Sequence, residues 1–221
     1  MGELTLISAA RGEMLDWAQA MVKEHHYLHA KVDQRCTPFA YVVELNGERV
    51  GCLIFGRPEA TRCYAGKFTY GSFDDVQAGR AKYDRWEVLN LARVWLDPRI
   101  QQGGEMYIPK AASTVIKMAL EMVGFNYLEA HPPVDCRYPY QIRCVLSYCD
   151  TRIHSGYVYM VSRFKLARMN KSGIQTWIKP VGRLGFSEDL RIRFLSIGNP
   201  RSRRIRMERE RKGAQLSWMN D

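Results

Sequence analysis

The sequence lacks the features that mark membrane-spanning, secreted or disulfide-stabilised proteins. Its 221 residues include no run of about 18 or more apolar residues, so a membrane-spanning helix is not expected. Residues 1–8 show no basic region ahead of an apolar block, which argues against a secretory signal. The six cysteines form no Cys-x-x-Cys pair, and we interpret them as reduced thiols of a cytosolic protein.

Acidic residues are too few to balance the basic ones. The chain has 33 Lys and Arg against 23 Asp and Glu, which gives a net charge of +10. This excess favours an anionic partner, either nucleic acid or a phosphorylated cofactor, although simple solubility would also account for it. Clustering favours the partner, and one cluster lies near the C-terminus: Arg201, Arg203, Arg204, Arg206, Arg209, Arg211 and Lys212.

Clear periodicity predicts the elements of the first half of the chain. Apolar residues at helical spacing predict a helix over residues 12–25. The β-rich runs Phe39–Leu45 and Arg49–Phe55 flank Asn46-Gly47 and predict a β-hairpin. Residues 60–82 are rich in Gly, Tyr and charge, and we expect a long loop there with a short helix at 72–77.

The middle and end of the chain continue the alternation of strands and helices. A central strand is expected over Trp86–Leu96, then a helix from Pro109 to Val123 with Gly124 as its C-cap. The remaining expected elements are a strand at 125–130, a helix rather than a strand at 140–147, a helix at 151–161, and a hairpin of 164–169 with 174–178.

This order of elements resembles that of the acyl-CoA N-acetyltransferase fold, an α/β fold with a mixed sheet and flanking helices. We therefore expect a single domain over residues 1–180 and a basic C-terminal extension over residues 181–221. In that fold two neighbouring parallel strands splay, and the pantetheine arm of the cofactor inserts between them. Its pyrophosphate rests on amides at the N-terminus of the helix that would begin near Pro109 here.

The start of this helix leaves the donor open. Ser113 lies in its first turns, where a serine can bind an anion or merely pack. Residues 101–104 are followed by five more residues before the helix, so the compact Gly-x-Gly turn of the general acetyltransferase pattern is missing. The sequence is compatible with an acyl-CoA-type donor or with another acyl donor.

Three of the five histidines lie in one short segment, His25-His26-Tyr27-Leu28-His29. His25 and His29 are four residues apart and would share a helix face, which suits a metal pair with Asp150 as a third ligand. Helix-terminal or core histidines would give the same pattern. A neutral imidazole would alternatively serve as a general base toward an amine-like nucleophile.

Three further polar residues stand out at positions where chemistry is expected. Asp150 precedes the expected helix at 151–161 and is either its N-cap or a carboxylate that orients His26 or the target amine. Tyr159 lies near the place where an acetyltransferase tyrosine protonates a leaving thiolate, unless its ring merely packs on the core. Arg93 interrupts an apolar strand and needs either a structural ion pair or an anionic ligand.

Aromatic and basic residues are interleaved between residues 57 and 86. The combination suits an extruded or single-stranded base, which stacks on the rings while its phosphates are neutralised. A loop folded over its own aromatic side chains is the alternative. The aromatic residues are Tyr64, Tyr70, Phe73, Tyr83 and Trp86, and the basic ones are Arg57, Arg62, Lys67, Arg80, Lys82 and Arg85.

Several segments together resemble the Mom family of DNA-modification proteins, known from phage Mu and related phages and prophages. The most specific motifs are Ser-Tyr-Cys-Asp-Thr-Arg at 147–152 and Gly-Ile-Gln-Thr-Trp at 173–177. The likeness extends over most of residues 25–178, through the segments 26–29, 51–63, 86–95, 146–154, 156–159 and 170–177.

The resemblance implies an enzyme whose product carries a carbamoylmethyl group on adenine N6 in duplex DNA, which protects phage DNA from restriction. The implied cofactors are an acyl-CoA-type donor and iron, the latter pointing to His25 and His29. The implied partners are DNA and the donor, in the cytoplasm of a bacterial host, with no membrane and with a homodimer left open. The residues that match the family are His26, Tyr27, Arg93 and Asp150, together with Tyr159 and Ser113 by position in the fold.

The sequence thus predicts a DNA-modifying transferase. Arg57, Arg62, Tyr64 and the tail arginines Arg201, Arg203 and Arg204 would bind DNA. His26 or Asp150 would take a proton from the adenine amine, and Tyr159 would supply one to the leaving group. Two alternatives stay open, namely an N-acetyltransferase acting on a small amine or protein lysine, and a DNA-binding protein without turnover.

Overall fold

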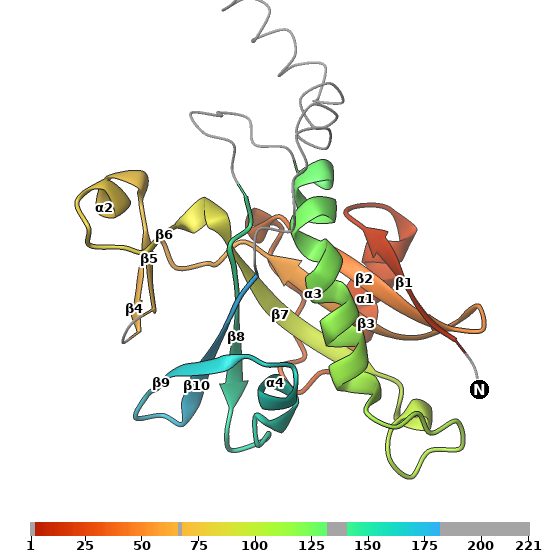
Figure 1. Cartoon of the computed structure of the whole chain (residues 1–221). Coiled ribbons are helices and arrows are strands. Elements are labelled where there is room, and N and C mark those ends of the chain that lie inside the picture. The colour runs from red at the N-terminus through yellow and green to blue at the C-terminus, as the bar shows by residue number, and fades with distance from the viewer. Residues whose placement is uncertain (1–2, 66–67, 132–140, 182–221) are drawn as a thin grey trace, which may run out of the picture.

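A seven-stranded mixed sheet runs through the molecule in the order β1-β2-β3-β7-β8-β10-β9 (Figure 1). The computed structural model describes residues 3–65, 68–131 and 141–181. Neighbouring strands are antiparallel except for the parallel pair β7–β8. The strands are β1 (Leu4–Ala9), β2 (Phe39–Leu45), β3 (Glu48–Gly56), β7 (Val88–Leu96), β8 (Cys144–Asp150), β9 (Lys165–Met169) and β10 (Ile174–Pro180).

Both predicted hairpins are confirmed. Asn46 and Gly47 have φ of 53° and 85°, which a two-residue turn with the right-handed twist of its strands requires. This turn joins β2 to β3, and a longer turn joins β9 to β10. The edge strand β1, which the sequence did not predict, pairs with β2 from Leu4↔Leu45 to Ala9↔Ala40.

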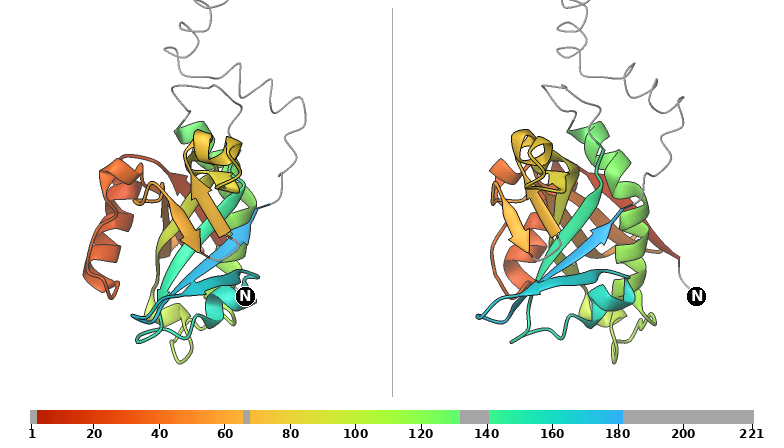
Figure 2. Two further views of the ribbon diagram at one scale, coloured as in Figure 1. Left: turned by 90° about the vertical axis from the view of Figure 1, so that its left-hand side faces the viewer. Right: turned by 60° about the vertical axis from the view of Figure 1, so that its left-hand side comes forward.

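Two long helices cover opposite faces of the sheet (Figure 2). The first is α1 (Glu13–His25), as predicted, which packs Leu15, Ala18 and Val22 against one face. The second is α3 (Ala111–Ala130), whose buried side lies on the other face with the largest core cluster. The remaining helical turns are α2 (Phe73–Gln77), α4 (Tyr157–Val161), η1 (Gln34–Cys36), η2 (Arg85–Glu87) and η3 (Pro98–Ile100).

The prediction that Gly124 ends α3 was wrong, as was the strand expected at 125–130. The helix continues to Ala130, and Tyr127 and Leu128 are buried on it. Their burial outweighs the cost of about 1 kcal/mol for one glycine inside a helix. A Cβ on Gly124 would lie 3.6 Å from the Cβ of Ile142, so the glycine sits where the helix meets the start of the next segment.

The helix favoured at 140–147 was also wrong, because Cys144–Asp150 forms the strand β8. Most of this strand is buried on both faces, so it shows no alternation of polar and apolar residues from which a strand could be recognised. The helix expected at 151–161 is reduced to the short α4, preceded by a turn. Asp150 is therefore the last residue of a strand and not the N-cap of a helix.

A small second sheet occupies the region that was predicted to be a long loop. It consists of β4 (Cys63–Ala65), β5 (Phe68–Gly71) and β6 (Tyr83–Asp84), beside the predicted short helix α2. Ser72 caps α2 through a capping box with Asp75, which explains why the helix begins there.

The seven-stranded sheet opens at its parallel pair, β7–β8. Pairing between β7 and β8 covers only Val88–Asn90 with Cys144–Leu146, although β7 continues to Leu96 and β8 to Asp150. Ala92 forms a bulge in β7, since Ile54 pairs with Arg93 and Phe55 with Leu91. The two strands diverge beyond this point (Figure 1). A bulged strand that splays from a parallel neighbour and leads into α3 is the topology of the acyl-CoA N-acetyltransferase fold, as predicted.

Residues 182–221, which hold nearly all of the predicted basic extension, lie outside the described part of the chain. Among the described residues, no helix combines the length and the apolar character that crossing a bilayer requires.

Candidate active site

Four residues predicted from the sequence, His26, Tyr27, Arg93 and Asp150, come from three separate segments and lie together where β7 and β8 diverge. The rings of His26 and Tyr27 are 4.4 Å apart, and Tyr27 meets His154 edge-on at 5.1 Å. Burial raises the pKa of the Tyr27 hydroxyl, the charge of Arg93 opposes this, and the charge of Asp150 adds to it. Tyr27 therefore keeps its proton at neutral pH and lies within the electrostatic reach of both charged groups.

His26 is held in its neutral form. Burial lowers its pKa to about 4, and the positive charge of Arg93 acts in the same direction. Its Nδ1 accepts a hydrogen bond from the backbone N–H of Leu28 at 3.2 Å, so the single ring proton lies on Nε2. In this arrangement His26 presents a hydrogen-bond donor. It is suited to hold an oxygen atom of a ligand, and not to take a proton as the sequence had suggested.

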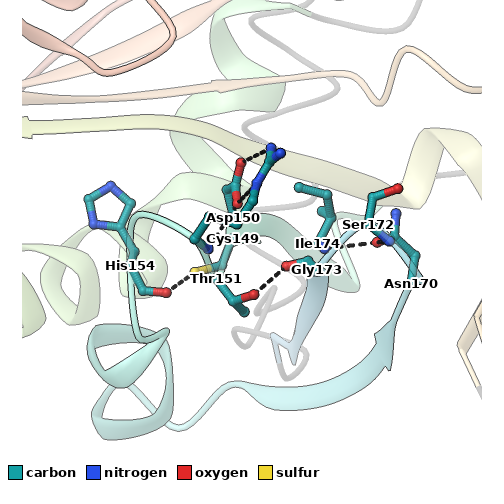
Figure 3. A network of polar contacts seen from close by, with 9 residues as sticks. Cys149, Asp150, Thr151, His154, Asn170, Ser172, Gly173 and Ile174 are labelled. Carbon is teal, nitrogen blue, oxygen red and sulfur yellow. Dashed lines mark hydrogen bonds and ion pairs between the residues drawn. The ribbon is translucent and has the colours of Figure 1, made fainter.

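Asp150 is a fixed negative charge at the end of β8 (Figure 3). The guanidinium of Arg152 donates from Nε to Oδ1 at 2.9 Å and from Nη2 to Oδ2 at 2.6 Å. The backbone N–H of Arg152 also donates to Oδ1 at 3.0 Å. These bonds to Arg152 lower the pKa of Asp150 to about 2. A carboxyl group with so low a pKa is a poor proton acceptor. What Asp150 contributes to the site is its negative charge near Tyr27.

The two most specific sequence motifs, 147–152 and 173–177, form the turn that holds Asp150. The hydroxyl of Thr151 donates to the carbonyl of Gly173 at 2.7 Å, which ties the end of β8 to the β9–β10 turn (Figure 3). A Cβ on Gly173 would lie only 3.0 Å from that hydroxyl. Gly156 has φ of 73°, and a Cβ there would meet Gln175 at 2.7 Å. Glycine is therefore required at both positions by close approach as well as by φ.

Tyr159 lies on the α3 side of the sheet, with its hydroxyl at the opening. Burial raises its pKa to about 12, and its ring stacks on Trp177 at 6.1 Å. Oγ of Ser147 lies 2.8 Å from the carbonyl oxygen of Leu91 and 3.0 Å from Oη of Tyr159. Ser147 is the donor in both contacts, so its one hydroxyl proton is shared between the carbonyl of Leu91 and the phenol oxygen of Tyr159. Because its pKa is raised, Tyr159 keeps its own proton at neutral pH.

Arg93 lies just after the bulge of β7. Its Nη1 donates to the carbonyl of Ala92 at 2.7 Å, and its Nε lies 3.3 Å from the carbonyl of Ala30. Burial lowers its pKa, opposed by Tyr27 and Glu59. Among the described residues its bonds go to carbonyls and not to a carboxylate ion pair, which leaves the cation available to an anionic or carbonyl oxygen of a ligand.

The histidine pair predicted to bind metal is not assembled. The helix α1 ends at His25, so His29 does not follow on the same helix face. His25 stacks on Trp95 at 5.1 Å, and Nδ1 of His29 lies 3.3 Å from the carbonyl of Lys23. Over residues 3–65, 68–131 and 141–181, no group of three or more His, Cys, Asp or Glu side chains is arranged to hold a metal ion.

The start of α3 differs from the anion site that was expected. The helix begins at Ala111 after Lys110, whose φ is 61°. The buried hydroxyl of Ser113 donates to the carbonyl of Lys110 at 3.1 Å, so it bonds to the preceding turn and packs rather than points at a ligand.

A group of cations lies beside α3 and α4. Burial, together with the charges of its neighbours Arg163, Lys117 and Lys165, lowers the pKa of Lys179. Within the described chain none of these four forms an ion pair with a carboxylate. A group of cations without a carboxylate counter-charge suits the phosphates of a nucleotide-type donor.

The residues predicted to bind DNA are scattered. Arg57 is only 7% exposed and its guanidinium lies between the rings of Trp86 and Tyr127, at 4.8 and 5.0 Å, so it supports the core and does not face a phosphate. Arg62 is more accessible but pairs with Asp75 at 2.8 Å. Tyr64 lies on β4, and the tail arginines Arg201, Arg203 and Arg204 lie outside the described residues.

The aromatic residues of this region mostly face inward. Phe68, Tyr70 and Tyr83 are buried together against Val88 and Leu146. A region folded over its own aromatic side chains, the alternative for this segment, fits these residues. Trp86 remains 44% exposed.

Sequence reasoning missed Asn90, Glu59 and Ser147. Asn90 and Glu59 line a small cavity together with Arg93, and Ser147 bridges the diverging strands. A polar residue at position 90 inside an apolar strand was a usable signal for the first. Nothing local marked Glu59, which belongs to the site only through the position of the chain between β3 and β4.

Comparisons with known proteins find similar structures but no family. No protein-family model and no curated protein matches the chain. Its structure is similar to the N-acetyltransferase PseH of Campylobacter jejuni in complex with acetyl coenzyme A (8% identity, 80% of this chain and 99% of that one, TM-score 0.41). It is also similar to yncA, a putative acetyltransferase from Salmonella typhimurium with acetyl-CoA (13%, 81% and 95%, 0.46). A third is FeeM, an N-acyl amino acid synthase from uncultured soil microbes (11%, 83% and 93%, 0.47).

Proposed function

We propose that this protein transfers a carbamoylmethyl group to the N6 amine of adenine in DNA, within an acyltransferase fold. The observation that carries the proposal is the convergence of His26, Tyr27, Arg93 and Asp150 at the opening between β7 and β8. These are the residues that match the Mom family, and they come from three segments that are far apart in the sequence. Such a product would hide adenine-containing sites from restriction enzymes.

The proposed transfer exchanges one bond to nitrogen for another. The adenine amine loses one N–H and gains a bond to the transferred carbon, while the leaving group departs with the bonding electron pair and takes up a proton. The amine is a weak nucleophile because its lone pair is delocalised into the ring. Tyr159 has a proton to give to the leaving group, and the proton lost by the amine returns to Tyr159 through solvent. Because the product joins N6 to a methylene carbon, the donor, an acyl-CoA-type or another activated carrier, must carry the leaving group on that carbon, since attack at a thioester carbonyl would give an amide.

Charged groups around the opening support positioning in this proposal. Nε2–H of His26 and the guanidinium of Arg93 are donors that would hold the amide oxygen of the transferred group. Asp150 holds a negative charge beside Tyr27 and thereby orients it. The cations around Lys179 lie on the opposite face, where a phosphorylated donor would meet the α3 side.

DNA as the acceptor is supported by the charge of the whole chain. The net charge is +10, and its densest cluster lies within residues 201–212. A tethered basic tail binds phosphates without regard to sequence and so raises the local concentration of DNA at the site.

A small amine or a protein lysine is the second candidate acceptor. One observation favours it: Tyr70 and Tyr83 are buried, and Asp75 pairs with both Arg62 and Arg80. The region from β4 to β6 therefore offers less cationic and aromatic surface to DNA than its composition suggested.

The test is mass analysis of nucleosides digested from plasmid DNA of cells that express the protein. We expect a deoxyadenosine adduct of carbamoylmethyl mass, absent when Asp150→Ala is expressed at the same soluble level. Unmodified deoxyadenosine from well-expressed wild-type protein would contradict the proposal. Tight acetyl-CoA binding without DNA affinity would then identify the small-amine acetyltransferase.

A further inference from the structure

Asn90 is the last residue of β7 that pairs in parallel with β8. It faces Leu146 on that strand and Gly56 of β3 on the other side. Its side-chain oxygen Oδ1 is buried and has no hydrogen-bond partner within the described part of the chain. Burying an unpaired amide oxygen destabilises a fold, so a residue of this kind inside an apolar strand calls for a ligand.

The same side chain lines a small cavity on the α1 face of the sheet. Its neighbours there include Arg93, Glu59 and Ala92, the bulged residue of β7. Parallel pairing with β8 ends at Asn90, and Arg93 both lines the cavity and acts on Tyr27 and His26, so the cavity adjoins the opening. Tyr159 packs against the core cluster on the α3 side, so donor and acceptor would approach the opening from opposite faces.

The cavity combines an acceptor oxygen with a guanidinium. A ligand that suits it carries an N–H donor next to an acceptor nitrogen in one plane. The amino edge of adenine has this pattern, with the N6 amine beside ring nitrogens on both sides, and asparagine is the side chain that matches it with both ends of its amide. Hypoxanthine has a carbonyl oxygen in place of the amine. That oxygen would face Oδ1 of Asn90, and two acceptors cannot form a hydrogen bond with each other.

We propose that Asn90 recognises the exocyclic amine of the acceptor base by accepting one N6–H at Oδ1. This inference rests on the proposed function and specifies how its site selects the base. Asn90 holds the amine at the opening with one N–H engaged, and the other N–H is the one replaced by the transferred group. It is a positioning and specificity residue, and it also accounts for the unpaired oxygen in the unliganded protein.

The test compares wild type with Asn90→Leu, which removes the amide at nearly constant volume. The probes are single-stranded oligonucleotides that are identical except for one adenine or hypoxanthine. We expect wild type to prefer adenine by roughly 10- to 100-fold and Asn90→Leu to lose that preference while still binding the backbone. Since an unpaired buried polar group is removed, the melting temperature should stay equal or rise. Asn90→Asp, which keeps an acceptor oxygen, should restore part of the preference.

Asn126→Leu is the matched control. Its amide donates to the hydroxyl of Tyr41 at 2.9 Å, so it is a paired asparagine on α3. Its replacement should lower the melting temperature and leave the preference for adenine unchanged. The two asparagine variants should therefore differ in opposite directions on the two readouts.

Two outcomes overturn different statements. If wild type forms the adenine adduct and Asn90→Leu forms it equally well with the same base preference, the role of Asn90 is refuted and the proposed function stands. If wild type neither modifies adenine nor prefers it to hypoxanthine, the proposed function fails, and adenine recognition by Asn90 fails with it.

Discussion

The hydroxyl of Ser147 on β8 donates to the carbonyl oxygen of Leu91 on β7 across 2.8 Å, immediately after the last parallel backbone pair. A side chain thus replaces the backbone ladder at the point where the strands separate. The same hydroxyl also donates to Oη of Tyr159 at 3.0 Å. The opening of the sheet and the orientation of the candidate acid are therefore set by one serine.

Replacing Tyr159 by Phe should slow the chemical step. Removal of a general acid typically costs about 10²- to 10⁴-fold in rate, and the ring contacts with Trp177 and Phe164 would be kept. Single-turnover kinetics with saturating donor and DNA would measure the rate. Tyr157 on the same helix is 63% exposed, and Tyr157→Phe should leave the rate unchanged. Equal rates for both variants would exclude Tyr159 as the acid.

Replacing Asp150 by Asn should separate its charge from its structural bonds. Asn keeps an oxygen for the backbone N–H of Arg152, so the turn after β8 is retained. Loss of the charge beside Tyr27 should lower adduct formation by about 100-fold, as for a removed electrostatic contact in other active sites. Arg152→Gln retains the carboxylate and should cost far less. Nucleoside mass analysis measures both, and the same loss in both variants would show that the ion pair matters instead of the charge.

The pKa of His26 makes stability depend on pH in a defined window. The unfolded chain binds a proton near pH 6.5 and the folded protein only near pH 4. Protons therefore favour the unfolded state as pH falls from about 6.5 to about 4, and the contribution of His26 to stability is lost across that range. Thermal unfolding of His26→Gln should show a shallower decline over this window. Burial also lowers the pKa of His131, so a residual slope should persist until that residue too is replaced. An unchanged slope in His26→Gln would contradict the argument.

Removing the basic tail should weaken the dependence of DNA binding on salt. Each phosphate neutralised by Lys or Arg contributes about 0.9 to the slope of log K against log salt. A chain that lacks residues 200–221 should therefore show a smaller slope, by several times that amount if the clustered arginines contact DNA. A chain that lacks only residues 214–221 loses no Lys or Arg and serves as the control. Equal slopes for the two truncations would place the DNA contacts elsewhere.

Local signals in the sequence determined several elements. The Asn46-Gly47 turn specifies its own backbone, and the spacing of Leu15, Ala18 and Val22 specifies the buried side of α1. Ser72 starts α2 through a capping box with Asp75, three residues away. In each case the residues that form the element also carry its determining interactions, so no distant partner is needed.

Long-range packing decided the elements that the sequence misjudged. The strand β8 is a strand because β7 and β10 bond to it and apolar neighbours cover both faces. The helix α3 passes Gly124 because Tyr127 and Leu128 find buried positions beyond it. Arg57 turned inward because two rings from distant segments, Trp86 and Tyr127, enclose it.

The composition of the site followed from the sequence, and its arrangement only from the tertiary structure. Sequence motifs singled out His26, Tyr27, Arg93 and Asp150. These residues lie together only because the chain after α1 crosses the diverging ends of β7 and β8. That Asp150 is paired, that His26 is an uncharged donor and that Asn90 is left without a partner are consequences of burial and of neighbours distant in the sequence. Residue type sets what a side chain can do, and desolvation and proximity in the folded protein select which of these possibilities is realised.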